Sequence, residues 1–298
     1  MKRYQDIPGD GGSRIVEQVT EQAERLKARL APVKHILAVM SGKGGVGKSS
    51  LTVNLAAALA MNSRTVGILD ADINGPSIAR MTGVKGQPLS QGESGIRPAV
   101  ADLNIRVMSI DLFLPHDNTP VLWEAPTQKD AYTWRGMMEV AALREFLRDT
   151  EWGELDYLLI DLPPGTDKLP NLVDVLPRLS GCIVVTIPSG VSQLVVRKSL
   201  TMATGVLKAP VLGLVENMSA YVCPHCGQEE PMFPAGQGER LAAEMEVPFL
   251  GKIPFDPRLA LAGDEGHFFV NRYPKLPAAQ AIHSLAEKIE TALSGGSS

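Results

Sequence analysis

One short segment, residues 41–50, constrains the fold of this chain more than any other. It reads Ser41-Gly42-Lys43-Gly44-Gly45-Val46-Gly47-Lys48-Ser49-Ser50 and separates an apolar run, residues 35–40, from a helix-like run, residues 51–61. Residues 42–49 match the Gly-x-x-x-x-Gly-Lys-Ser phosphate loop, in which glycines let backbone N–H groups wrap a polyphosphate at a helix N-terminus. The order strand, loop, helix therefore predicts a nucleotide site.

The side chains of this loop have separate expected roles. Lys48 places its ammonium on the terminal phosphates, and the Ser49 hydroxyl is left to ligate Mg²⁺. A second lysine, Lys43, stands where the simple motif leaves the residue free, so it could reach the nucleotide of a neighbouring subunit. The expected nucleotide-binding residues of the loop are Gly42, Lys43, Gly44, Gly45, Val46, Gly47, Lys48, Ser49 and Ser50.

The composition of the chain indicates an ordinary soluble globular protein. Its 298 residues include 44% hydrophobic and 21% charged residues, which suits one α/β domain with short extensions. The formal net charge of -4 gives no electrostatic argument for nucleic acid or an anionic membrane as the main partner. Residues 1–10 show no secretory signal, and no apolar run approaches the ~20 residues that span a bilayer. We expect a cytoplasmic protein.

Apolar runs alternate with helical stretches along most of the chain. The runs are nearly continuous in Val, Ile and Leu, which is typical of buried parallel strands, and comprise residues 35–40, 65–69, 105–110, 157–160, 182–187, 211–215 and 249–253. Helical patterns fit between them at residues 49–61, 137–148, 192–208 and 237–245. This order predicts an α/β fold with a doubly wound, mostly parallel sheet and a ligand at the carboxyl ends of its strands.

The ends of the chain differ from its centre. Residues 1–33 form an N-terminal extension, expected to be disordered up to residue 12 and then a short amphipathic helix. Residues 34–293 form the predicted P-loop ATPase domain, with loops at residues 86–95 and 115–129 and a closing helix at 278–293, and residues 294–298 a disordered tail.

Aspartates follow two of the predicted strands. Asp161 comes directly after an apolar run, where a nucleoside triphosphatase holds magnesium, usually through water. Asp72 is the candidate to orient or deprotonate the attacking water, whereas Asp70 is expected to be structural. A strand-end aspartate can also be a simple helix cap. Gly165 could present its N–H to a γ-phosphate, which would make the loop after Asp161 a switch.

Cys223 and Cys226 stand two residues apart in Cys-Pro-His-Cys. Two thiolates can bind one metal or cluster, but they make only half of a four-cysteine shell. His225 could complete the shell for zinc, Cys182 could if it were not buried in its strand, or a second subunit could supply its own pair across a two-fold axis. A zinc knuckle and a thioredoxin-like redox pair are the alternatives.

Taken together, these motifs resemble the Mrp/ApbC branch of the MinD/ParA class, the iron-sulfur cluster carrier ATPases. The similar segments are residues 42–49, 70–77, 152–157, 161–166, 215–219 and 223–226. The resemblance covers residues 34–290 and is specific, because MinD and ParA proteins lack the Cys-x-x-Cys.

The resemblance implies a slow ATP hydrolase that uses ATP and Mg²⁺ and acts as a homodimer. Lys43 would contact the phosphates of the partner, and Cys223 and Cys226 of both subunits would bridge a 4Fe-4S cluster. This cluster would be delivered to apo iron-sulfur client proteins under the control of ATP.

The resemblance also assigns roles at the nucleotide edge of the sheet. Asn217 would match the residue that reads the adenine. The loop after Ile253, including Pro254 and Asp256, would close over the base. Asp72 and Asp161 match the switch I and Walker B carboxylates of the family.

The chain departs from the family pattern in three places. The family continues Pro-Pro-Gly-Thr with Gly-Asp, whereas Thr166 is followed here by Asp167 and Lys168, which should stiffen or reshape switch II and affect hydrolysis more than binding. Residues 122–133 look like an insertion that could bind a partner. The small N-terminal domain of many members is replaced by about 30 residues.

Two other functions compete with the carrier. A MinD/ParA-like positioning ATPase could carry a structural zinc knuckle, but residues 278–298 contain Lys288 as their only Lys or Arg and lack a basic face for a membrane. A basic surface for DNA is not evident either. A nitrogenase-iron-protein-like reductase has its two cysteines far apart in sequence, unlike Cys223 and Cys226.

Overall fold

A nine-stranded sheet forms the centre of the molecule. The computed structural model describes residues 15–116, 119, 131–223, 225–234 and 236–295. Within them the strand order is β10-β9-β8-β1-β7-β2-β6-β5, with β11 also paired to β9. The strands are β1 (Val33–Ser41), β2 (Val66–Asp70), β5 (Ala99–Val100), β6 (Arg106–Met108), β7 (Leu155–Asp161), β8 (Gly181–Thr186), β9 (Val211–Val222), β10 (Glu229–Pro231) and β11 (Phe249–Phe255).

Seven of these strands are parallel, and two short ones are antiparallel. β11, β9, β8, β1, β7, β2 and β6 run in one direction, whereas β10 runs against β9 and β5 against β6. A separate hairpin joins β3 (Ser90–Gln91) to β4 (Ile96–Arg97). The carboxyl ends of the parallel strands therefore meet at one edge of the sheet.

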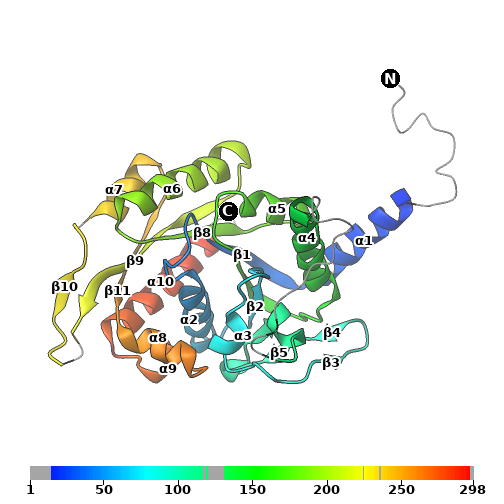
Figure 1. Ribbon diagram of the computed structural model, residues 1–298, viewed down its shortest axis with the longest axis horizontal. Coiled ribbons are helices and arrows are strands. Elements are labelled where there is room, and N and C mark those ends of the chain that lie inside the picture. Colours follow the sequence, from blue (N-terminus) through cyan, green and yellow to red (C-terminus); the bar gives the residue numbers. More distant parts are fainter. Residues whose placement is uncertain (1–14, 117–118, 120–130, 224, 235, 296–298) are drawn as a thin grey trace.

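Helices cover both faces of the sheet (Figure 1). One apolar layer contains α2 (Lys48–Met61), α8 (Pro257–Asp264), α9 (Phe269–Arg272) and α10 (Pro277–Ser294). The other contains α1 (Ile15–Leu30), α4 (Ala131–Asp149), α5 (Lys168–Val175), α6 (Gly190–Thr201) and α7 (Gln237–Glu244). A short helix, α3 (Ile78–Met81), and two 3-10 turns, η2 (Asp102–Asn104) and η3 (Ile110–Phe113), complete the nucleotide half. The predicted doubly wound fold is confirmed.

Burial on both faces explains the continuous apolar runs. In β1, Leu37 and Val39 belong to the layer of α2, whereas Ile36, Ala38 and Met40 belong to the layer of α1 and α4. A strand covered on one face would alternate between apolar and polar residues. α2 is likewise apolar around most of its circumference, because α10 and α9 cover the side that faces away from the sheet.

All seven predicted strands form, but several details differ from the sequence-based expectation. The helix expected at residues 137–148 begins six residues earlier, at Ala131. β9 continues past residue 215 to Val222, and the expected loop at residues 86–95 contains β3. The expected helix at residues 192–208 ends at Thr201 and continues as a π-helical turn, Met202–Val206. Of the other expectations, the disorder of residues 1–12, the insertion up to residue 130 and most of the 115–129 loop lie outside the described residues.

The amphipathic helix predicted near the N-terminus is α1. Its Leu26 and Leu30 are buried and join the apolar layer that includes α4, against which α1 packs. The boundaries of the extension, the ATPase domain and the tail remain a prediction. Within the part of the chain that the structure describes, no helix has the length and apolar character needed to cross a membrane.

Candidate functional site

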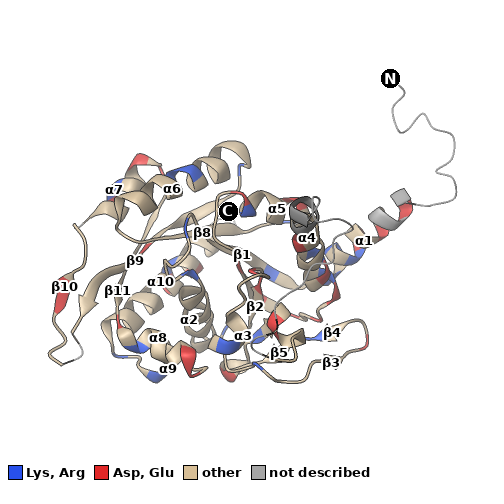
Figure 2. Ribbon diagram, viewed as in Figure 1, with Lys and Arg blue, Asp and Glu red and all other residues tan. Residues whose placement is uncertain are grey.

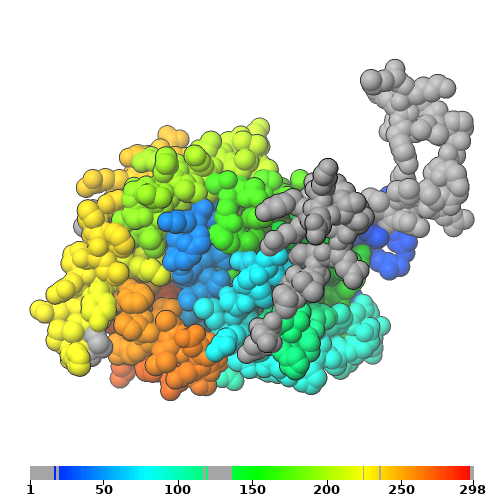
Figure 3. All heavy atoms as spheres, viewed as in Figure 1, coloured from blue at the N-terminus to red at the C-terminus, as the bar shows by residue number. Residues whose placement is uncertain are grey.

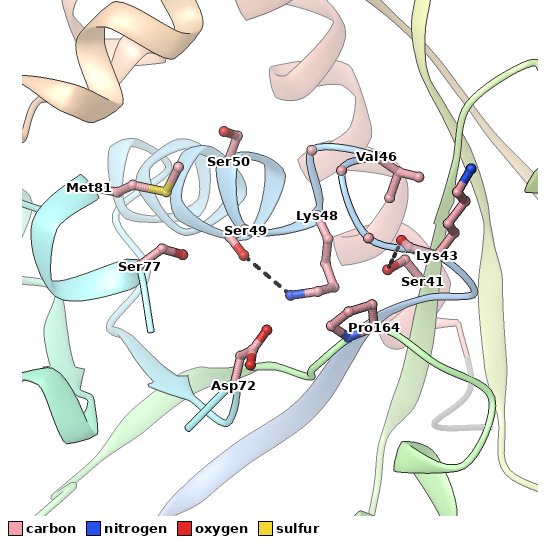
Figure 4. A pocket seen from close by; sticks show the side chains of 13 residues that line it. Ser41, Lys43, Val46, Lys48, Ser49, Ser50, Asp72, Ser77, Met81 and Pro164 are labelled. Atoms are coloured by element: carbon pink, nitrogen blue, oxygen red, sulfur yellow. Dashed lines mark hydrogen bonds between the residues drawn. The ribbon is translucent and has the colours of Figure 1, made fainter. Parts of the chain in front are cut away.

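The predicted phosphate loop connects β1 to α2 and lines a cavity of about 300 Å³ (Figure 4). Gly45 and Gly47 have φ angles of 77° and 79°, a left-handed backbone that glycine adopts without strain. A Cβ at Gly47 would lie 2.3 Å from Nδ2 of Asn217. Residues from outside the loop that line the same cavity are Asp72, Ser77, Met81 and Pro164. In Figure 3 the loop (blue) reaches the surface beside the cyan segment that follows β2.

Lys48 and Asp161 form a buried ion pair at the floor of this cavity. Lys48 Nζ lies 2.7 Å from Asp161 Oδ2, and both side chains are almost inaccessible to solvent. The Ser49 hydroxyl donates to the same carboxylate oxygen at 2.6 Å. The structure therefore brings together the residues predicted to hold phosphate and magnesium, and Asp161 provides a negative charge at the predicted metal position.

Thr52 is a partner of Asp161 that the sequence-based reasoning missed. Its hydroxyl donates to Oδ1 of Asp161 at 2.7 Å. Residues four apart in a helix share a face, so Thr52 lies one turn beyond Lys48 on the side of α2 that faces β7. Helical spacing from the loop lysine is the signal that could have found it.

Asp70 anchors the segment between β2 and α3. Its carboxylate accepts the N–H groups of Ser77 and Ile78 and the hydroxyl of Ser109, each at 3.1 Å. Burial, followed by the nearby Asp161 carboxylate, raises the pKa of Asp70 to about 7, although the two N–H donors and the charge of Lys48 oppose the shift. These contacts fit the predicted structural role, because Asp70 holds residues 72–77, named here the switch I segment, at the edge of the cavity.

Asp72 lines the cavity and is half-buried. In Figure 4 its carboxylate and the ammonium of Lys48 approach each other across the pocket. Burial raises the pKa of Asp72, whereas the charge of Lys48 and the N–H of Gly75 lower it. A carboxylate beside the phosphate lysine is suitably placed to orient a water molecule.

Gly165 belongs to residues 163–168, named here the switch II segment. Its N–H donates to the carbonyl oxygen of Ser41 at 3.0 Å, and its φ angle is 129°. Pro164 lines the phosphate cavity, whereas Gly165 does not. The predicted contact of the Gly165 N–H with a γ-phosphate therefore requires the segment to exchange this hydrogen bond for a new one.

Lys43 is the exposed lysine of the loop. Lys43 belongs to the lining of the cavity, but its side chain points away from Lys48 (Figure 4). The backbone is held because the Ser41 hydroxyl donates to the Lys43 carbonyl at 3.0 Å. This orientation leaves the ammonium accessible to another molecule.

Asn217 contacts the phosphate loop directly from β9. Its Nδ2 donates to the carbonyl oxygen of Val46 at 2.9 Å, and the side chain is buried. The next residue, Met218, has a φ angle of 55°, which kinks the strand. Asn217 therefore supports the loop, a contact that the motif did not reveal.

The structure does not bring Pro254 and Asp256 to the phosphate cavity. Pro254 lies within β11 and not in a loop, and it lines a separate cavity of about 300 Å³ with Glu216 and Lys252. Asp256 is buried, caps α8 through the N–H of Arg258, and binds the guanidinium of Arg258 at 2.8 and 2.7 Å. The expected loop at Pro254 is thus wrong, because pairing with β9 continues as far as Phe255.

The cysteine pair lies in the turn between β9 and β10, at the edge of the molecule (Figure 1). The N–H of Gly227 donates to the Cys223 carbonyl at 2.9 Å, which closes a tight turn. The backbone N–H groups of Cys226 and His225, and then the side chain of Cys226, lower the pKa of the Cys223 thiol. The Cys226 thiol itself donates to Oε1 of Gln228 at 3.8 Å. This turn therefore favours the thiolate, the form that binds metal.

Cys182 cannot join this pair. It is fully buried in β8, and burial raises the pKa of its thiol to about 12. The prediction that it is a core residue is confirmed. Among the described residues there is no group of three or more His, Cys, Asp and Glu that could hold a metal ion. Within those residues the cysteine pair thus has no third ligand from its own chain.

A glycine-rich loop with two lysines connects strand β1 to helix α2, and an aspartate ends the neighbouring strand β7. This arrangement defines a P-loop NTPase of the ParA/MinD class. The ParA family model, described as NUBPL iron-transfer P-loop NTPase, matches residues 32–133 and 125–290. The chain therefore belongs to this family, and the resemblance inferred from its motifs is confirmed.

Relatives from distant organisms agree with this membership. An iron-sulfur cluster carrier protein of Saccharolobus solfataricus is 42% identical over 93% of this chain and 90% of its own length. The human cytosolic Fe-S cluster assembly factor NUBP2 is 44% identical over 87% of this chain and 93% of its own length.

Solved structures show the same fold. A nucleotide-binding protein of Archaeoglobus fulgidus in complex with ADP superposes with a TM-score of 0.68, at 36% identity over 83% of this chain and 92% of that one. The cell division ATPase MinD of Pyrococcus furiosus gives a TM-score of 0.59 at 23% identity, over 87% of this chain and 99% of MinD, and supports the fold alone.

Proposed function

We propose that this protein is an ATP-dependent carrier that binds a 4Fe-4S cluster between two copies of the chain and transfers it to apo iron-sulfur proteins. The observation that carries the proposal is one strand, β9, that contacts a phosphate-loop cavity through Asn217 and ends next to a thiolate-favouring cysteine pair with half a ligand set. The cluster is the cargo of the reaction. The names of the S. solfataricus and human relatives point to the same cargo.

ATP and Mg²⁺ would occupy the cavity of the phosphate loop. The backbone N–H groups of residues 42–50 would hold the phosphates, and Lys48 would exchange Asp161 for the terminal phosphate oxygens. Ser49 and Asp161 would hold Mg²⁺, which neutralises charge on the phosphates. Asp72 would orient the attacking water. The A. fulgidus neighbour, which is in complex with ADP, supports nucleotide binding in this fold.

Two copies of the chain would meet at the face that carries Lys43. Beside the loop, α6 exposes the apolar side chains of Val191 and Leu194, which are 64% and 58% accessible. The first turns of α6 pack on the loop, because a Cβ at Gly42 would lie 2.9 Å from Val195 Cγ1. Apolar side chains next to an outward-pointing lysine favour a second copy as the partner.

Strand β9 offers a physical link between the two sites. It contacts the phosphate loop through Asn217, is kinked at Met218, and ends one residue before Cys223. A strand rises about 3.3 Å per residue, so residues 217 and 223 are about 20 Å apart along it. A shift of the loop on nucleotide binding would therefore be transmitted to the cysteine turn.

Cluster transfer to an apo-protein of the 4Fe-4S class tests this function. Cluster-loaded wild-type protein should restore the absorbance and activity of the client in the presence of ATP and Mg²⁺. Replacing both Cys223 and Cys226 with Ala should remove the cluster, and Lys48→Ala should abolish transfer. Normal transfer by a Lys48→Ala variant that no longer binds nucleotide would contradict control by ATP.

The competing function is a positioning ATPase with a structural zinc knuckle. The N–H donors that lower the pKa of Cys223 would serve a zinc thiolate as well as an iron thiolate. Stoichiometric zinc in the purified protein, together with failure of the transfer assay, would favour that function.

A further inference from the structure

Three side chains from different segments meet between the two switch segments. Asn74 of switch I donates through Nδ2 to Oε1 of Glu139 at 2.6 Å. Lys168, at the end of switch II, places Nζ 3.4 Å from Oε2 of the same carboxylate. Each oxygen of the Glu139 carboxylate, on α4, therefore contacts a different switch segment.

The contacts lie in a partly enclosed cleft. The side chain of Glu139 is 16% accessible and that of Lys168 is 26% accessible. The cleft is also lined by Ala71, which precedes Asp72, and by Leu162 and Pro163, which follow Asp161. Ala71 and Leu162 are the direct chain neighbours of Asp72 and Asp161, so the cleft adjoins both carboxylates assigned to water and magnesium.

Lys168 stands where the sequence departs from the family pattern after Pro-Pro-Gly-Thr. It is the first residue of α5 and lies three residues after Gly165. Because Gly165 donates its N–H to the carbonyl oxygen of Ser41, this N–H is not available to a phosphate. A fixed Lys168 would hold switch II in this arrangement.

We propose that Glu139 is a positioning residue that clasps switch I to switch II through Asn74 and Lys168 and restrains both in the nucleotide-free protein. This inference rests on the proposed ATP hydrolysis, for which the clasp must open. Release of Lys168 frees switch II to exchange the Ser41 contact for a γ-phosphate contact.

The charge of Glu139 also acts on Asp72. Burial raises the pKa of Asp72, the charge of Lys48 and the Gly75 N–H lower it, and the carboxylates of Asp161 and Glu139 raise it. Replacing Glu139 with Gln removes one of the two raising charges. The pKa of Asp72 should therefore fall.

Hydrogen exchange of the nucleotide-free protein tests the clasp without any activity. Glu139→Gln keeps the shape of the side chain but removes the ion pair, so exchange in peptides spanning the switch I and switch II segments should become about three- to fivefold faster. Glu145→Gln, a charge removal at an exposed position of the same helix, is the matched control and should leave both peptides unchanged. Unchanged exchange in the Glu139→Gln variant would overturn the proposal.

ATP hydrolysis then tests the consequence. Glu139→Gln and Lys168→Met should each raise the hydrolysis rate about three- to fivefold, and the double variant should equal the single variants instead of multiplying them. The acid limb of the pH profile should move to lower pH in Glu139→Gln but not in Lys168→Met. A lower rate in Glu139→Gln, or additive effects, would contradict the restraint. If the wild-type protein does not hydrolyse ATP, the proposed function is refuted. The hydrogen-exchange experiment would still test the clasp in that case.

Discussion

The phosphate loop and the cysteine turn differ in how completely one chain supplies their contacts. At the loop, Lys48, Ser49 and Thr52 surround the buried carboxylate of Asp161. At the turn, Cys226 is exposed, and the contacts of the two thiols are with neighbouring residues of the same turn, Cys226, His225 and Gln228. The turn also adjoins the acidic strand β10, red in Figure 2, instead of a positive counter-charge.

This difference separates two ways of building a site. A buried charge must be paired within the fold, because water cannot reach it, so Lys48 and Asp161 are part of the buried interior. An exposed thiolate is solvated, so it is stable without a ligand and can bind one from outside the chain. We infer that the loop contributes to the stability of one chain, whereas the turn becomes complete only with cargo and a second copy.

Removing Lys48 should have the largest effect at the loop. Lys48→Ala leaves Asp161 buried without its counter-charge, so the free energy of unfolding should fall by about 3–5 kcal/mol. Nucleotide binding should be lost as well. Urea unfolding of the nucleotide-free protein measures the first effect and titration with an ATP analogue the second. Adding Asp161→Asn to the Lys48→Ala variant should recover part of the lost free energy of unfolding. No recovery would mean that loss of the ion pair is not the cause of the destabilisation.

Asp70 should make stability depend on pH. Burial raises the pKa of Asp70 to about 7 in the folded protein, against an ordinary value of 3.8. The folded state then holds a proton that the unfolded state releases, so this stabilisation is complete below pH ~4 and is lost as the pH rises toward ~7. Between about pH 5 and 7 the loss should be about 2 kcal/mol. Asp70→Asn should flatten this part of the profile, and an unchanged slope would contradict the assignment.

Gly47→Ala should disturb the loop less severely. The new Cβ would meet Nδ2 of Asn217 at 2.3 Å, on a backbone with a φ angle of 79°. We expect a loss of about 1–3 kcal/mol and weaker binding of ATP. Gly45→Ala is the matched control, because Gly45 has a similar φ angle but nothing within 4 Å of its Cβ direction. Equal effects of both variants would show that contact with Asn217 is unimportant.

The cysteine turn should be the least sensitive to substitution. Replacing Cys223 and Cys226 with Ala in metal-free protein should change the free energy of unfolding by no more than about 0.5 kcal/mol. Thermal and urea unfolding of both proteins provide the measurement. If wild-type protein as purified loses much stability when chelated, the turn holds a structural metal and the contrast with the loop fails.

Local signals in the sequence predicted most of the fold. The seven parallel strands are continuous apolar runs, and the phosphate loop is one contiguous motif whose backbone geometry follows from its glycines. The antiparallel strand β10 contains Glu229, Glu230 and Pro231, which carry no strand signal of their own. It forms because β9 extends beyond the core and offers a partner.

Contacts between distant segments could not be predicted. Glu139 reaches Asn74 and Lys168 across 65 and 29 residues of sequence, and Asn217 reaches Val46 across 171. No periodicity encodes such pairs, because they depend on how α4 and β9 pack. Asp256 shows the converse, since a family role was expected for it and the structure pairs it with Arg258.

Iron, acid-labile sulfide and zinc analysis of protein purified without oxygen, with the mass of the assembly in solution, tests the central claim most directly. The carrier predicts about four irons and four sulfides per two chains, lost when Cys223 and Cys226 are both replaced by Ala. Stoichiometric zinc without sulfide, and no cluster after reconstitution with iron and sulfide, would contradict it.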